Sequence, residues 1–348
     1  MKLLIITQKV DKNDPTLGFF HDWIIELSKK AESVSVVCLK KGSMDLPSNV
    51  TLYSLGKSNA EQTRNRRGTM RIKYILNLYK YLSKLSGSYD KVFVHMNQEY
   101  VLLAGLYWKM KKIPVYTWRN HPNGGILTNI AVLLSTKVFS TSKASFVARF
   151  KKAVIMPVGI DVKIFKPLDG VIRKKHSVCM VGRISPIKHI ELGLMALKKL
   201  IDSGVQVSLD ILGPIAERDQ SYANVLRDYV NKNNLASFVN FLSPVASSKL
   251  AEIYSSYEIC LNLTESGSFD KTIVEASACG AIPLVSNISL WHLLPEVCIT
   301  NDSLEAVALS LEKLLNVHEQ MEIQEKLKSF VESQSLDNLM EKLFLEMK

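Results

Sequence analysis

Short apolar runs alternate with longer amphipathic stretches along most of the chain. Runs of about four to eight residues predict strands, and the stretches between them, such as 19–30 and 98–110, predict helices. The runs are continuously apolar, which is typical of parallel sheets covered on both faces. The predicted strands are 2–7, 34–39, 91–96, 113–118, 137–142, 176–182, 205–213, 238–243, 258–263 and 282–286, and the later helices are 187–203, 221–233, 247–256 and 271–279.

The alternation occurs twice, and a segment rich in Gly and Pro at 156–170 separates the two series. A chain of 348 residues fits two domains of roughly 150 residues each. We therefore expect an α/β protein with two doubly wound parallel-sheet domains, Rossmann-like, facing each other across a cleft. The expected domains are 1–165 and 166–330, followed by a terminal amphipathic segment at 331–348.

Composition narrows the class of protein. Apolar residues make up 47% of the chain, and no apolar run reaches the roughly 18 residues that a membrane-spanning helix needs. The opening MKLLIIT runs straight into charged residues, so it predicts a first strand rather than a signal peptide. The five cysteines form no CxxC pair, which favours a reducing, cytoplasmic compartment and argues against structural zinc.

Charge is distributed unevenly between the two halves. Residues 1–170 hold 27 Lys or Arg and 11 Asp or Glu, a net charge of +16, whereas the remainder has 17 and 22, a net charge of −5. No acid occurs between Glu61 and Asp90, or between Glu99 and Asp161. The first half therefore faces a negative partner, such as nucleic acid, an anionic membrane or a phosphorylated ligand. Nucleic acid is disfavoured because no zinc-finger or RNP-like motif is present.

The segment 64–85 predicts a basic amphipathic helix with aromatic residues. One interpretation is docking on the anionic inner face of the plasma membrane, where each base contributes on the order of 1 kcal/mol. The alternative is a helix whose apolar face packs on the core and whose basic face is exposed to water. The apolar positions at helical spacing are Ile72, Ile75, Leu76, Tyr79 and Leu82, and the bases largely off that stripe are Arg71, Lys73, Lys80 and Lys84.

Two stretches carry candidate chemistry at the ends of predicted strands. In VGRISPIK, a strand ends at Gly182, and Arg183 and Lys188 follow in the turn that leads into a helix. Both cations can reach an anion placed over the start of that helix, where the helix dipole adds to their attraction. The alternative is that they are two solvated loop bases.

The second stretch is TESGSFDKTIVEASACGAIPLVS at 264–286. The small residues Ser266, Gly267 and Ser268 allow a ligand close to the backbone. Free N–H groups around Lys271 to Ile273, including that of Thr272, could hold a phosphate. Glu275 lies one turn further into the helix, among apolar neighbours. A carboxylate there suits a partner that donates hydrogen bonds, such as the vicinal hydroxyls of a ribose. The alternative is an acid favoured by the helix dipole.

These motifs, in this order, resemble a known family. PVGID with the following F-x-P (157–167), GRISPIK (182–188) and GSFDKTIVEASACGAIPLVS (267–286) look like the signature series of glycosyltransferase family 4, whose members have the GT-B fold. The stretches 14–38 and 92–108 look like the acceptor-side domain of bacterial members. The resemblance implies a retaining enzyme that moves a sugar from a nucleotide-diphosphate sugar to a lipid-linked or polysaccharide acceptor in bacterial cell-surface glycan synthesis.

The resemblance also assigns roles to single residues. Arg183 and Lys188 match the pair that grips the donor diphosphate, and Glu275 matches the glutamate that holds the ribose hydroxyls. Gly18 matches the glycine beside the donor phosphate. His121 matches a histidine that touches the transferred sugar, although a plain loop histidine is the alternative. No cofactor and no metal are expected, because stabilisation of the departing diphosphate does most of the work and no Asp-X-Asp motif is present.

One position departs from the family pattern. Gly267 stands where the first of two glutamates is expected, while Phe269 matches the aromatic position. Asp270 and Lys271 replace a small and an apolar residue, so Asp270 or Glu265 becomes a candidate contact to the sugar. The departure leaves open a non-catalytic subunit with the same fold. A sugar epimerase or phosphorylase would need an acid/base set or a lysine-bound cofactor that the motifs do not place.

The end of the chain has two interpretations. The resemblance implies that 331–348 crosses back to the first domain as a helix. The alternative is a terminal helix that packs on its own domain.

Overall fold

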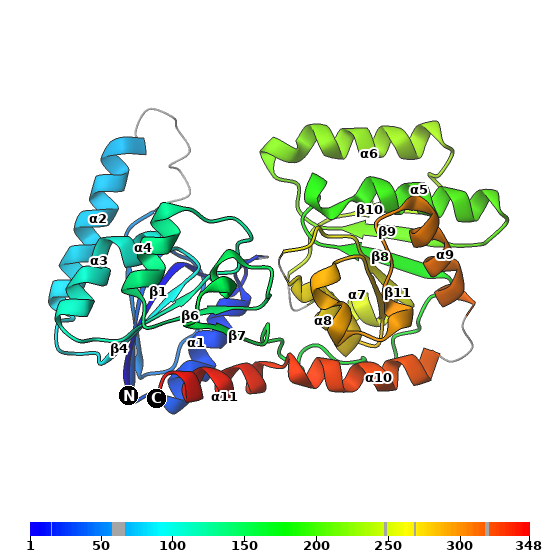
Figure 1. Cartoon of the computed structure of the whole chain (residues 1–348). Coiled ribbons are helices and arrows are strands. Elements are labelled where there is room, and N and C mark those ends of the chain that lie inside the picture. Colours follow the sequence, from blue (N-terminus) through cyan, green and yellow to red (C-terminus); the bar gives the residue numbers. More distant parts are fainter. Residues whose placement is uncertain (15, 58–66, 247–248, 268, 317–319) are drawn as a thin grey trace. The chain divides into compact units, whose positions relative to one another are not determined.

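The chain folds into two compact units in the computed structural model (Figure 1). Unit 1 contains Met1–Met156 and Met340–Lys348, and unit 2 contains Pro157–Leu339. Each unit is built on one parallel sheet flanked by helices, so the expected pair of Rossmann-like domains is confirmed. The structure describes residues 1–14, 16–57, 67–246, 249–267, 269–316 and 320–348.

Unit 1 is built on a parallel sheet of seven strands in the described residues. They are β1 (Lys2–Val10), β2 (Ser33–Lys41), β3 (Val50–Ser54), β4 (Lys91–His95), β5 (Val115–Trp118), β6 (Lys137–Ser140) and β7 (Ala153–Ile155). Their order is β3-β2-β1-β4-β5-β6-β7. The sequence pattern missed the edge strands β3 and β7, because both are short and only partly buried and so lack a continuous apolar run.

Helices cover both faces of this sheet. They are α1 (Phe19–Lys30), α2 (Arg67–Lys84), α3 (Glu99–Met110), α4 (Ile126–Leu134) and the C-terminal part of α11 (Leu336–Glu346). Successive side chains of a strand point to opposite faces. In β4, Val92 and Val94 pack with α2 and α3, whereas the rings of Phe93 and His95 lie against Phe20 of α1.

The last residues of the chain contact unit 1. Lys137 Nζ donates to Glu346 Oε2 at 2.8 Å, and the hydroxyl of Tyr116 donates to the carbonyl of Met347 at 3.3 Å. The ammonium of Lys30 in α1 lies 5.4 Å from the ring centre of Phe344 in α11. The segment Met340–Lys348 is therefore part of unit 1 although the rest of α11 and α10 belong to unit 2.

Unit 2 has a five-stranded parallel sheet in the order β10-β9-β8-β11-β12. Its strands are β8 (Ser177–Val181), β9 (Ser208–Leu212), β10 (Val239–Leu242), β11 (Ile259–Asn262) and β12 (Ile282–Val285). Its helices are α5 (Ile190–Asp202), α6 (Gln220–Lys232), α7 (Leu250–Ser255), α8 (Lys271–Ala278), α9 (Leu304–Leu315) and α10 (Gln320–Ser333).

The strand order of unit 2 reverses between β8 and β11. Connections from β8 run outward through β9 and β10, and the chain then returns to β11 on the other side of β8. In open α/β sheets, ligands bind beyond the carboxyl ends of the strands at such a reversal. The candidate cations after Gly182 and the candidate loop after Asn262 both lie at this reversal.

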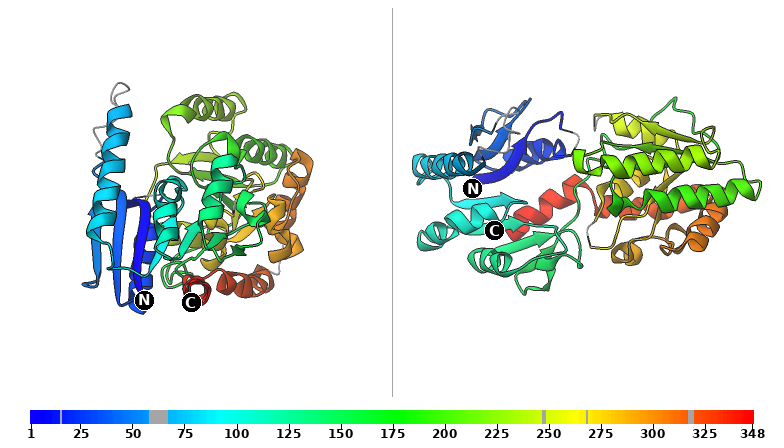
Figure 2. Two further views of the ribbon diagram at one scale, coloured as in Figure 1. Left: turned by 60° about the vertical axis from the view of Figure 1, so that its left-hand side comes forward. Right: turned by 90° about the horizontal axis from the view of Figure 1, so that it is seen from above.

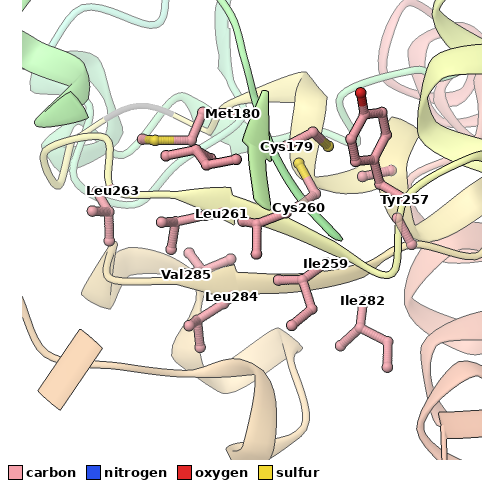
Figure 3. Packing of buried hydrophobic residues seen from close by; sticks show 14 of the residues in the cluster. Cys179, Met180, Tyr257, Ile259, Cys260, Leu261, Leu263, Ile282, Leu284 and Val285 are labelled. Carbon is pink, nitrogen blue, oxygen red and sulfur yellow. The ribbon is translucent and has the colours of Figure 1, made fainter. Parts of the chain in front are cut away.

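The strands at the reversal are anchored in a dry core. Figure 3 shows Cys179, Ile259, Cys260, Leu261 and Leu284 packed together, and each is at most 2% exposed. Burial of this kind contributes about 1.5–3 kcal/mol per large apolar side chain. All five cysteines of the chain are buried and form no disulfide bonds. The core therefore holds the ends of β8 and β11 in fixed positions, and the loops that follow them carry the polar groups.

Candidate functional site

The first loop of the site begins at Gly182, directly after β8. Gly182 has φ 143°, a conformation that side chains other than glycine rarely adopt, and a Cβ atom there would lie 3.3 Å from Lys188 Cε. The glycine therefore lets Lys188 fold back over the end of the strand. Arg183 is exposed beside it. Gly182, Arg183 and Lys188 line a small pocket together with Asn262 and Thr264 from the end of β11.

A network of polar side chains fills the base of this pocket. The ammonium of Lys188 forms an ion pair with Asp270 and donates to Thr264 Oγ1 at 3.1 Å. Asp270 Oδ2 also accepts from Asn262 Nδ2 at 3.0 Å and from Thr264 Oγ1 at 3.2 Å. An ammonium has three N–H groups, and this network uses two of them. One donor of Lys188 is therefore available to an anion that enters the pocket.

The charge state of Asp270 follows from its surroundings. Burial opposes ionisation, but the attraction of Lys188 and the hydrogen bonds from Lys188, Asn262 and Thr272 lower the pKa of this carboxyl below its ordinary value. Asp270 is thus a carboxylate at neutral pH and pairs with the ammonium of Lys188.

Asp270 also caps helix α8. Its Oδ1 accepts from the Thr272 N–H at 3.4 Å, and its carbonyl accepts from the Ile273 N–H at 3.3 Å. The sequence predicted that N–H groups at this helix start are open to a phosphate. That expectation is wrong for Thr272 and Ile273, because a preceding Asp is a favoured cap residue and satisfies them internally. Thr272 Oγ1 in turn accepts from Asn262 Nδ2 at 3.0 Å.

Glu275 lies in the second turn of α8 and is 9% exposed. Its Oε2 accepts from the buried hydroxyl of Tyr254 at 3.2 Å. Burial raises the pKa of Glu275 to about 7, and the charge of Lys271 on the same helix works in the opposite direction. The carboxyl therefore takes up its proton near neutrality. Hydroxyl groups of a ligand would favour the ionised form, since they donate to it as Tyr254 does.

The loop between β11 and α8 has little room for the family's first glutamate. Gly267 is buried and has φ 132°, so a glutamate at this position would be strained. Ser268, also predicted to contact the donor, lies outside the described residues. Phe269 is buried and its ring stacks on Phe330 with the centroids 6.2 Å apart, so it packs against α10. This places Phe269 in the core of unit 2 rather than in the pocket.

The exposed acid of this loop, Glu265, has a histidine neighbour. Glu265 Oε1 lies 3.4 Å from His189 Nε2, and the Glu265 N–H donates to the carbonyl of Ile187 at 3.2 Å. His189 Nδ1 lies 3.3 Å from Glu191 Oε1. These contacts join the loop after β11 to the loop after β8, so the two halves of the candidate site are held against each other.

Gly18 and His121 lie in unit 1. Gly18 is buried at the start of α1, and a Cβ atom there would lie 2.6 Å from the carbonyl oxygen of Asp14. Asp14 orders that loop, since its Oδ1 accepts from the N–H groups of Thr16 and Leu17 at 2.8 Å each. His121 is exposed in the loop after β5, where its Nδ1 accepts from the Asn123 N–H at 3.0 Å. Their roles toward a ligand stay predictions.

Three residues of the site were missed at the level of sequence. Asn262 and Thr264 hold Asp270 and Lys188 in place, and Tyr254 donates to Glu275. A signal did exist for the first two, because they are polar residues at the end of an otherwise apolar strand. Nothing local marks Tyr254, whose partner is 21 residues away. In the part of the chain that the structure describes, no three His, Cys, Asp or Glu side chains gather as a metal-binding group.

The C-terminal half of the chain matches a family model, described as glycosyl transferases group 1, over residues 169–341. Curated relatives include D-inositol 3-phosphate glycosyltransferases. The protein from Mycobacteroides abscessus is 31% identical over 140 residues, which are 38% of this chain and 30% of the relative. The protein from Rhodococcus opacus is 28% identical over 145 residues, or 39% and 32%. The matches thus span about a third of the length of these relatives.

Solved structures resemble the chain over nearly its whole length. HepE from Anabaena, in complex with UDP-glucose, has a TM-score of 0.78 at 15% identity and covers 100% of this chain and 99% of its own. WaaG, a glycosyltransferase involved in lipopolysaccharide biosynthesis, has a TM-score of 0.69 at 16% identity, with 98% of each chain covered. Two parallel-sheet units of this kind define the GT-B fold. Residues 169–341 of this chain therefore belong to the group 1 glycosyltransferase family, and the chain as a whole has the GT-B fold.

Proposed function

We propose that this chain is a retaining glycosyltransferase that moves a sugar from a nucleotide-diphosphate sugar to a lipid-linked or polysaccharide acceptor in bacterial cell-surface glycan synthesis. The observation that carries the proposal is the pocket at the ends of β8 and β11. Arg183 and Lys188 converge there, and Lys188 is fixed by a partly buried Asp270. Two cations at one strand end bind a diphosphate better than they bind a neutral ligand.

The chemistry needs positioned charge and no covalent intermediate. The acceptor hydroxyl attacks the anomeric carbon on the face from which the nucleoside diphosphate leaves. The bond between that carbon and the diphosphate oxygen breaks, and the hydroxyl proton passes to the departing phosphate oxygen. Arg183 and the third N–H of Lys188 stabilise the charge that develops on the diphosphate. Groups of this kind contribute typically a factor of about 100–1,000 in rate.

Glu275 supplies the nucleoside end of the proposed site. It lies one turn deeper on α8 than Thr272 and is held by Tyr254. A carboxylate there accepts hydrogen bonds from two vicinal ribose hydroxyls. UDP-glucose is the first donor to test, because the HepE structure holds it and shares this fold. Asp270 and His121 are the further candidates for contacts to the transferred sugar.

The acceptor is proposed from the charge of unit 1. Its residues carry 27 Lys or Arg and 11 Asp or Glu, a net charge of +16. A lipid-linked acceptor on the cytoplasmic leaflet presents phosphate groups and lies among anionic lipids. A cytoplasmic protein that works on the inner face of the plasma membrane fits both properties.

The test is release of nucleoside diphosphate from a panel of nucleotide sugars by the purified chain, with a mixed lipid and glycan acceptor extract. Wild type should release it from at least one donor. Arg183→Ala and Glu275→Ala should lose this release while keeping their far-UV circular dichroism. Arg218→Ala, which changes an exposed arginine of the same unit, is the matched control and should keep it. Full activity in both site variants would overturn the assignment.

A second function is favoured by one observation. Gly267 offers no side chain where the family presents its first glutamate, and its backbone conformation disfavours one. A chain that keeps the fold but lacks turnover would act as a binding subunit of another glycosyltransferase. No release from any donor in the panel, together with stabilisation by a partner protein from the same cells, would favour this second function.

A further inference from the structure

Large apolar side chains gather on the solvent side of three helices of unit 1. Among the described residues, 18 large hydrophobic side chains are exposed, and nine of them lie on α2, α3 and α4. Single exposed apolar residues are ordinary, but a gathered set marks an interaction surface. We call this set the α2–α4 face; it consists of Ile72, Leu76, Tyr79, Leu106, Met110, Ile126, Leu127, Ile130 and Leu133.

The three helices lie side by side on one face of the sheet (Figures 1 and 2). The hydroxyl of Tyr79 in α2 donates to the carbonyl of Leu103 in α3 at 2.7 Å. On the other side, α3 packs on α4 so closely that a Cβ atom at Gly105 would lie 2.9 Å from Leu134 Cβ. The α2–α4 face is therefore one continuous surface.

The fold does not need these side chains. In α2, Leu78 and Leu82 already form the stripe that packs on the sheet, and Leu85 extends it directly after the helix, whereas Ile72 and Leu76 point the other way. The same holds for α4, where Ala131 and Val132 are buried and Ile126 is 78% exposed. A helix with an apolar stripe toward solvent and another toward its own core suits an apolar environment outside the protein.

The described residues around this face carry an excess of positive charge. Residues 67–134 contain only two acids, Asp90 and Glu99. Five lysines on or directly after these helices form no ion pair with a carboxylate among the described residues; they are Lys73, Lys80, Lys109, Lys111 and Lys112. On the opposite side of the sheet, by contrast, acids and bases balance in α1 and in residues 340–348. The acids are Asp22, Glu26, Glu341 and Glu346, and the bases are Lys29, Lys30, Lys342 and Lys348.

We infer that the α2–α4 face docks on an anionic lipid bilayer, with the apolar side chains of α4 entering the interface and the lysines contacting headgroups. Bases gain on the order of 1 kcal/mol each near such a surface, and the apolar groups leave water at the acyl boundary. A second copy would bring two positive faces together, which opposes docking. Nucleic acid would leave the apolar side chains without a partner.

The α2–α4 face makes contact with the membrane surface and does not insert across the bilayer. No helix in the described ranges is both long and apolar enough to span a bilayer. This contact also does not depend on sugar transfer, so the docking and the proposed enzymatic function can fail separately.

The test is flotation of the full-length chain with vesicles of phosphatidylcholine alone or with about one quarter phosphatidylglycerol. Wild type should float with the anionic vesicles and largely stay behind with the neutral ones. Binding should fall steeply between about 0.1 M and 1 M salt, where the screening length shrinks from about 10 Å to 3 Å. Equal flotation with both vesicles, or none with either, would overturn the inference.

Substitutions separate the apolar and the charged contributions. Leu133→Glu should weaken vesicle binding about 10-fold or more, since an exposed leucine that leaves water is replaced by a charge. Leu309→Glu is the matched control, because Leu309 is 68% exposed on α9 of unit 2 and Leu133 is 66% exposed on α4. Lys80→Gln should weaken binding about 5-fold, and Lys313→Gln in α9 should leave it unchanged. Equal effects of the matched pairs would contradict docking by this face.

Two further measurements keep the outcomes distinct. Thermal melts and circular dichroism of each variant should match wild type, because every changed side chain points to solvent. Light scattering should show a monomer without lipid. A dimer that Leu133→Glu dissociates would show that a second copy covers the face, and would overturn the lipid inference. Stabilisation by a nucleoside diphosphate should be the same in all these variants.

Discussion

Unit 1 and unit 2 share a parallel α/β plan and use their cations in opposite ways. In unit 2, Lys188 is partly buried and fixed by Asp270, Thr264 and the end of a strand. In unit 1, Lys73 and Lys80 stand exposed beside apolar side chains of α2 without a carboxylate partner among the described residues. A fixed cation suits a small ligand with defined geometry, because its position is settled before binding. Mobile surface cations suit an extended anionic surface that has no fixed geometry.

The two kinds of cation differ because they lie in different places: Lys188 lies at the end of a sheet, whereas Lys73 and Lys80 lie on the outside of a helix layer. At a strand end, neighbouring loops approach from several sides and can supply hydrogen-bond partners, as Asn262 and Thr264 do. On an outer helix face only water and neighbouring side chains are available. Buried charges must be paired, whereas exposed charges need no partner. The following substitutions test whether this contrast holds, from the largest expected effect to the smallest.

Asp270→Ala should lower the free energy of unfolding by about 3–5 kcal/mol, because it leaves the ammonium of Lys188 partly buried without its carboxylate and removes the cap of α8. Asp202→Ala is the matched control, since Asp202 pairs with Lys198 at 2.7 Å on the exposed side of α5. That variant should change stability by less than about 1 kcal/mol. Urea unfolding of both measures the difference. Similar small losses would show that the Lys188 pair is no more than a surface contact.

The lowered pKa of Asp270 adds a pH dependence. Its ionised form stabilises the fold above the pKa of the unfolded chain, and this stabilisation disappears as pH falls through the folded pKa. The difference in stability between wild type and Asp270→Ala should therefore be full at pH 6–7 and shrink on strong acidification. A difference that stays constant down to pH 2 would contradict ionisation of this carboxyl.

Glu275→Gln should change stability in the opposite direction to Asp270→Ala, because it should stabilise the fold at high pH. Because burial raises the folded pKa of Glu275 from 4.5 to about 7, the folded state keeps a proton that the unfolded chain loses, and stability falls as pH rises through this window. Gln removes the cost of a buried charge and still accepts from Tyr254. At pH 8 the variant should be more stable than wild type by about 3 kcal/mol, and at pH 4 nearly equal. Urea unfolding at both pH values measures this, and a difference independent of pH would refute the raised pKa.

Lys80→Gln should have the smallest effect on the fold, below about 0.5 kcal/mol, because Lys80 is exposed and forms no ion pair with a carboxylate of the described residues. A loss close to that of Asp270→Ala would mean that the cations of unit 1 are built into the fold, and the contrast between the units would fail. The same urea titration gives the answer.

The fold was largely predictable because it depends on regular patterns. Continuous apolar strands and the helices between them gave the parallel sheets, and α8 begins at Lys271 as expected. Helix α4 was missed because ILTNIAVLL is apolar all round and so lacks a periodic stripe, the same property that leaves Ile126 and Ile130 exposed. Amphipathic periodicity detects a helix only when one of its faces is polar.

The sequence predicted single residues of the site, but not the contacts that join them. Gly182, Arg183 and Lys188 stand at a strand end that the pattern marked, and the structure brings them together with Asp270. The ion pair itself joins residues 82 apart in the sequence, so no local signal could reveal it. The buried hydroxyl that Tyr254 presents to Glu275 is likewise a product of tertiary packing.

The most direct test of the central claim is the thermal unfolding of unit 2 in the full chain with a nucleoside diphosphate. A nucleotide at about 100 times its dissociation constant should stabilise wild type by about 2.7 kcal/mol, and Arg218→Ala equally. Arg183→Ala at the same concentration should lose most of this stabilisation. If Arg183→Ala is stabilised as much as wild type, or no nucleoside diphosphate stabilises wild type, the pocket at the ends of β8 and β11 does not bind the donor diphosphate.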